Sequence, residues 1–143
     1  MASQVLNTIK DKIKEKLQGI TDIQAIYEYA TINFSGYPAA VINFQTIDSS
    51  VEDLKHNERI YRFIVHLFYE SENTSREMAQ ARLEDVAEQV VNAFETDQFL
   101  DGITMPSGID ALWIRPSTNP IVKEDKWLIC DIELPIRVSF SII

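Results

Sequence analysis

The chain has 143 residues, of which 45% are hydrophobic and 24% are charged, as in an ordinary globular domain. This length predicts one domain over residues 1–143, whose core needs no metal or disulfide support. The net charge of −9 argues against nucleic-acid or anionic-membrane binding through a basic surface, and no apolar run approaches the roughly 20 residues of a membrane span.

The first predicted element is an amphipathic helix over about residues 3–17. Its apolar residues recur every four positions and form one stripe, opposite lysine and glutamate: Val5, Ile9, Ile13 and Leu17. Alternation over residues 23–29 then predicts a half-buried strand. A Gly-Tyr-Pro sequence ends this strand, and residues 39–45 are expected to form a second one.

The third strand, expected over residues 59–69, has the strongest pattern in the chain. One face carries Tyr61, Phe63, Val65, Leu67 and Tyr69, and the other carries Ile60, Ile64 and Phe68. A strand that is apolar on both faces is usually central in its sheet and covered twice, by helices or by a partner subunit.

The second half of the chain adds a long helix over about residues 75–96 and two strands, over residues 109–115 and 127–143. Pro135 in the last strand indicates a bulge or a strand edge. The resulting order, α-β-β-β-α-β-β, predicts an α+β fold. We expect an antiparallel sheet of about four to five strands with two helices on one face.

The residues that could carry chemistry form no recognisable motif. The four glycines make no phosphate-binding loop, and the two histidines and one cysteine lack the spacing of a zinc site. His66 is expected to be partly buried with a hydrogen-bond partner, and Cys130 to pack in the core. The sequence therefore predicts no catalytic residues, no cofactor and no metal.

The order of the elements nevertheless resembles one protein family. The relevant segments are Gly36-Tyr37-Pro38-Ala39-Ala40-Val41-Ile42, the strand from Asn57 to Tyr69, Ala81-Arg82-Leu83-Glu84-Asp85-Val86, and the terminal strand from Trp127 to Phe140. Together they are similar to the small tail terminator, or tail completion, proteins of long-tailed bacteriophages, including the lambda-type terminator.

This resemblance implies a structural protein of the virion, located at the head-proximal end of the tail and assembled in the host cytoplasm. Its subunits would form a homohexameric ring that caps the tail tube protein, stops tube polymerisation and offers a surface to the head–neck connector. Phage DNA would pass through the lumen without specific binding, since an acidic wall repels phosphate. The family supplies no catalytic residues.

The polar stretch at residues 46–58 is longer than an ordinary hairpin loop. Its apolar residues recur at the spacing of a nascent helix, which we expect to order against a neighbouring subunit or the tube. A passive loop that covers its own sheet edge is the alternative. The subunit or tube interface is predicted at Ile47, Val51, Leu54, Asp53, Arg59 and Arg62.

Two other functions fit the same sequence. A neck or head–tail connector subunit would have a similar size and a similar alternation of elements. A small ligand-binding or hydrolytic α+β enzyme would place its site near His66 and Cys130.

Overall fold

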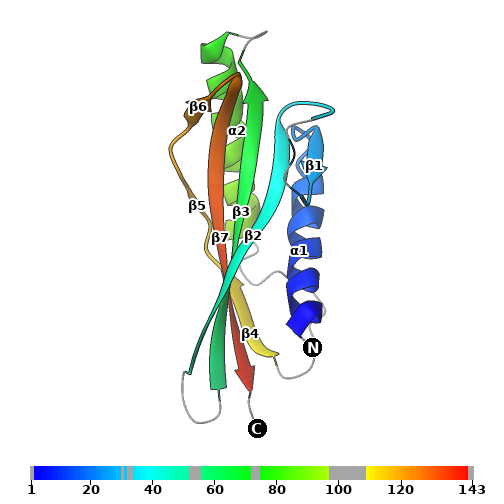
Figure 1. Cartoon of the computed structure of the whole chain (residues 1–143), viewed down its shortest axis with the longest axis vertical. Coiled ribbons are helices and arrows are strands. Elements are labelled where there is room, and N and C mark those ends of the chain that lie inside the picture. The colour runs from blue at the N-terminus through cyan, green and yellow to red at the C-terminus, as the bar shows by residue number, and fades with distance from the viewer. Residues whose placement is uncertain are drawn as a thin grey trace.

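The computed structural model describes residues 2–29, 31, 34–51, 56–71, 75–96 and 109–141. Over these ranges Figure 1 shows a long, twisted sheet accompanied by two helices. The elements in chain order are α1 (Ala2–Gln18), β1 (Ala25–Tyr27), β2 (Ala39–Val51), β3 (His56–Glu70), α2 (Arg76–Glu95), β4 (Ile109–Ile114), β5 (Ser117–Thr118), β6 (Val122–Glu124) and β7 (Trp127–Ser141).

The predicted antiparallel sheet of four to five strands, in the order α-β-β-β-α-β-β, is wrong. The described residues form a seven-stranded sheet in the order β1-β2-β3-β7-β4, and β5 and β6 also pair with β7. Because β1 runs parallel to β2, the sheet is mixed. β5 and β6 have two and three residues, which is too short for alternation to be visible in the sequence.

The stretch expected to be a loop, residues 46–58, is mostly strand. β2 continues to Val51 and β3 begins at His56, and the two pair antiparallel over this length; residues 52–55 lie outside the described ranges. A bulge between Phe44 and Thr46 shifts the register. The side chain opposite Tyr61 is consequently Ile47 rather than Thr46.

Two ion pairs between strands explain why a polar sequence is extended here. Arg62 Nε lies 2.7 Å from Asp48 Oδ2, and Arg137 Nη1 lies 2.6 Å from Glu58 Oε1. Opposite charges on neighbouring strands stabilise pairing. We call residues 46–51, 56–62, 109–114 and 135–141 the β arm, whose distal end projects beyond both helices (Figure 1).

One face of the sheet packs against both helices. Alternate residues of β3 and β7 are buried on it: Tyr61, Phe63, Val65, Leu67, Leu128, Cys130, Ile132, Leu134, Ile136 and Val138. The stripe predicted for α1 joins them in one core cluster, together with Ala79, Leu83, Val86, Ala87, Val90 and Phe94 of α2. Burial of apolar surface on this face is the main source of stability.

Pro135 occupies an interruption in the sheet. β4 ends with Ile114 opposite Ile136, and β5 begins with Ser117 opposite Glu133. The β3–β7 register passes Pro135 without a shift. The proline, which has no N–H to donate, therefore lies beside the break between β4 and β5.

The opposite face of the sheet, which we call the open face, carries the other alternate residues of β3. Ile60, Ile64 and Phe68 are only half-buried there, so β3 is central but is covered by helices on one side alone. Phe34 covers part of the upper end, with its ring centroid 4.8 Å from that of Phe68. The described residues include no helix long and apolar enough to cross a membrane.

Candidate functional site

The structure divides the predicted interface residues between the two faces of the β arm. Ile47 is 41% exposed and lies opposite Tyr61, on the side of the helices. Arg59 lies on the same side and donates a hydrogen bond from Nη1 to the Tyr61 hydroxyl at 3.2 Å, whereas Arg62 pairs with Asp48 on the open face. Val51 ends β2.

Two of the predicted interface residues, Asp53 and Leu54, lie outside the described ranges. Ile47 and Val51 belong to a strand, so the helical spacing proposed for this stretch does not describe its first half. In a strand, residues four apart also share a face, which is why the sequence pattern could be read either way.

The β arm has two sheet edges without a strand partner in the described part of the chain. β1 pairs with β2 only from Ala39 to Val41, and residues 45–49 of β2 are exposed at every position. β4 is the last strand on the other side. Edge strands commonly carry lysine or proline that discourages pairing with another chain, but residues 42–51 contain neither.

These two edges lie at the same level of the sheet. Ser49, Arg59, Val138 and Leu112 form one row across β2, β3, β7 and β4. The next row in each direction along the strands also contains one residue from each of these four strands. A strand added to either edge would therefore continue the same sheet.

A second group of polar residues crosses the open face above the β arm. His66 Nδ1 lies 2.6 Å from Asp131 Oδ1, and the two residues face each other on β3 and β7. Asn43 Nδ2 lies 3.5 Å from His66 Nε2. The imidazole therefore lies between the carboxylate and the amide, within hydrogen-bond distance of both.

The histidine and its carboxylate line a groove of about 660 Å³. Its walls also include Phe68 and Trp127, and Glu124 of β6 stands at its rim. Apolar walls with a few convergent polar groups are typical of binding sites. The groove is thus the strongest candidate for recognition of a small chemical group.

Cys130 and His66, which the enzyme hypothesis would bring together, lie on opposite faces. Cys130 is buried on the side of the helices, whereas His66 lies in the groove of the open face. Burial, and to a lesser degree the charge of Asp131, raises the pKa of the Cys130 thiol to about 11. A protonated, buried thiol is a poor nucleophile.

We expect Cys130 to react slowly with iodoacetamide in the folded protein. A thiol whose pKa is about 11 stays protonated at pH 8, and the thiolate is the reactive form. Alkylation followed by mass spectrometry should accelerate by at least about tenfold in urea, where burial is lost. Equal rates in the folded and the unfolded protein would contradict the described burial.

Neither the contact between His66 and Asp131 nor the position of Glu124 beside the groove was predicted from the sequence. Alternation already placed His66 and Asp131 on one face of their respective strands. Which residues of two strands so distant in the chain stand opposite each other is set by register, and no short-range pattern encodes that.

Neither protein-family models nor curated proteins give a match to this chain. Across the residues that the structure describes, no three or more histidine, cysteine or acidic side chains are grouped so that they could hold a metal ion. The two features that invite a functional interpretation are therefore the edges of the β arm and the groove.

Proposed function

We propose that the protein is a structural ring subunit of the tail terminator class, which caps the tail tube of a long-tailed phage. The observation that carries the proposal is that two edges of one sheet, β2 on one side and β4 on the other, have no further strand partner among the residues that the structure describes. Unpaired edge strands are templates for pairing with another chain.

The strand directions favour a head-to-tail contact between subunits. Each of the pairs β2–β3, β3–β7 and β7–β4 is antiparallel, so β4 runs antiparallel to β2. Copies related by a rotation about an axis along the strands keep these directions. The β4 edge of one subunit would then meet the β2 edge of the next in an ordinary antiparallel ladder.

The lengths of the two edges also agree. β4 has six residues with a bulge between Ile109 and Ala111, and it spans the same five rows of the sheet as residues 47–51 of β2. A contact between two different edges is heterologous, and it closes into a ring when the rotation per subunit divides a full turn. The family resemblance suggests six subunits.

The outer surface of α2 suits a DNA passage. The exposed face of α2 carries more acidic than basic residues: Glu77, Glu84, Asp85, Glu88 and Glu95 against Arg76 and Arg82. An acidic surface does not retain nucleic-acid phosphates. We propose that DNA passes this surface without specific binding, while the tube protein and the head–neck connector bind the two ends of the ring.

The oligomeric state is the first test of this proposal. Native mass spectrometry and negative-stain images of isolated tail tubes with added protein should show a closed cyclic oligomer, expected to be a hexamer, at tube ends. Tubes grown in the presence of the protein should stop lengthening. A strict monomer that never binds a tube end would refute the assignment, and a ring that binds portal complexes but not tubes would favour the neck connector instead.

A further inference from the structure

We propose that the groove on the open face binds a guanidinium group carried on an apolar stem, the chemistry of an arginine side chain. The inference is independent of the ring proposal, because it rests on the groove near the upper end of the sheet and not on the β arm.

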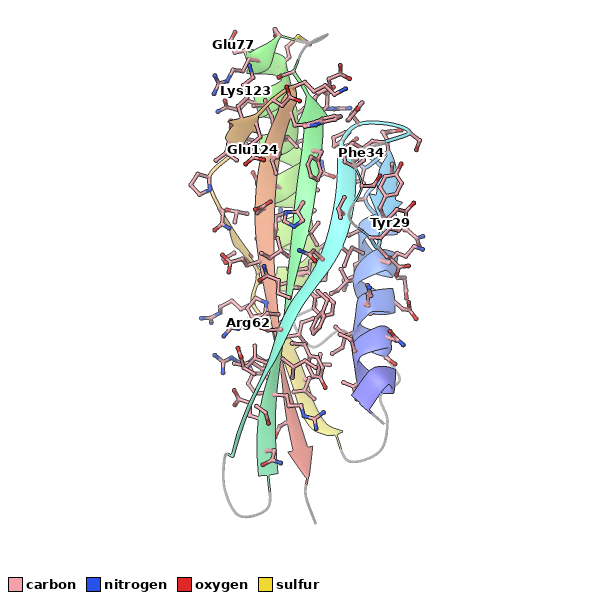
Figure 2. All side chains as sticks on the ribbon, in the orientation of Figure 1. Tyr29, Phe34, Arg62, Glu77, Lys123 and Glu124 are labelled. Carbon is pink, nitrogen blue, oxygen red and sulfur yellow. The ribbon has the colours of Figure 1, made fainter. Side chains whose placement is uncertain are left out.

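The polar groups of the groove favour a cation. Asp131 and Glu124 both line it, and the described residues that line it include no lysine or arginine. Glu124 is exposed and makes no ion pair with the described part of the chain. Figure 2 shows Glu124 on β6, beside β7, where its carboxylate is open to a ligand.

His66 positions the second carboxylate. Its Nδ1 engages Asp131 Oδ1 at 2.6 Å, which leaves the other oxygen of Asp131 available to accept. A carboxylate held by one hydrogen bond and by its strand presents that oxygen in a fixed direction. Charge-assisted hydrogen bonds from N–H donors to such oxygens are the strong ones in proteins.

The walls of the groove favour a flat organic cation over a metal ion. Phe68 and Trp127 line it, and the Phe34 ring packs against both, with its centroid 4.8 Å from that of Phe68 and 5.3 Å from that of Trp127. Aromatic faces attract cations, and guanidinium also stacks on them. Lys126 Nζ already lies 4.8 Å from the Trp127 ring centroid and occupies one face of this buried indole, so the half-buried Phe68 is the aromatic wall left for a ligand.

The proposal can be tested by nuclear magnetic resonance with two small probes. Ethylguanidinium should shift the Trp127 indole and His66 ring signals saturably. Ethylurea, which has a similar shape and no charge, should bind at least about tenfold more weakly, because the carboxylates provide the attraction. Ionic strength is matched with sodium chloride.

Two variants and one control locate the site. Glu124→Gln and Asp131→Asn should each weaken ethylguanidinium binding by about fivefold, the size expected for an exposed ion pair. Glu133→Gln removes the same charge from an exposed position of β7 outside the groove and should leave binding unchanged. Because Glu124 is exposed, its variant remains informative even if Asp131→Asn destabilises the fold.

A third probe, the peptide acetyl-Gly-Arg-Gly-amide, distinguishes the source of the group. Binding at least about tenfold tighter than that of ethylguanidinium would indicate an arginine presented by a protein chain, and equal binding would indicate a free small cation. Either result supports the proposal. Three results would overturn it. These are no saturable shifts with any of the three probes, equal affinities for ethylguanidinium and ethylurea, or a loss of affinity in the Glu133→Gln control as large as that in the two groove variants.

Discussion

Ser49→Lys is expected to abolish ring assembly while leaving the melting temperature of the isolated subunit nearly unchanged. Ser49 is exposed and lies opposite Arg59, in the stretch of β2 that has no second strand partner among the described residues, so the variant costs the free subunit only the small repulsion between two solvent-accessible like charges. Lysine on an edge strand opposes pairing with a second sheet. Burying its charge in the contact should weaken association by roughly 100-fold or more.

Gln80→Lys is the matched control, since it adds the same charge at an exposed position of α2. Sedimentation velocity over a range of concentrations should find rings with the control variant and monomers with Ser49→Lys. If Ser49→Lys assembled as readily as the unmodified protein, the β2 edge would not be the contact.

Phe63→Ala should cost the subunit about 3–5 kcal/mol of unfolding free energy, the usual range for a buried phenylalanine. Phe63 is 1% exposed and its ring centroid lies 5.4 Å from that of Phe44, on the face packed by the helices. Urea unfolding in the Ser49→Lys background measures this loss without a contribution from assembly.

Ile64→Ala provides the comparison from the next residue of the same strand. Ile64 is half-buried on the open face, so truncating it should cost roughly 1 kcal/mol in the monomer, since less apolar surface is lost. Equal losses for Phe63→Ala and Ile64→Ala would mean that both faces of β3 are covered within one subunit.

Short-range patterns in the sequence were enough to predict the helices and the central strand. The four-residue spacing of Val5 and Ile9 in α1 is a property of one helix face, and both residues are buried as that spacing requires. The alternation around Tyr61 and Phe63 likewise identifies the buried face of β3. Burial on one face leaves a periodic trace in the sequence.

The β arm and the direction of β1 were not predictable by the same means. Residues 46–51 are polar enough to suggest a loop, but they pair with a strand that continues from the core, so tertiary context decides their conformation. The parallel pairing of Ala25 with Ala39 depends on how the chain returns through residues 28–38. No periodic pattern in the sequence indicates whether β1 runs parallel or antiparallel to β2.

The groove could not be predicted from the sequence for a related reason. His66 and Asp131 are 65 positions apart in the chain, and only the register of β3 with β7 places them opposite each other. The sequence suggested that His66 has a hydrogen-bond partner, and the structure confirms this. Identifying Asp131 as that partner required the pairing of the strands.

The central claim is that subunits join through the edges of their sheets. A three-dimensional reconstruction of the assembled ring by electron cryomicroscopy tests it most directly. We predict that β2 of each subunit runs antiparallel to β4 of the next, with main-chain hydrogen bonds between residues 46–51 and 109–114. A closed ring whose subunits meet through α1 or α2, with both sheet edges left in solvent, would contradict the account.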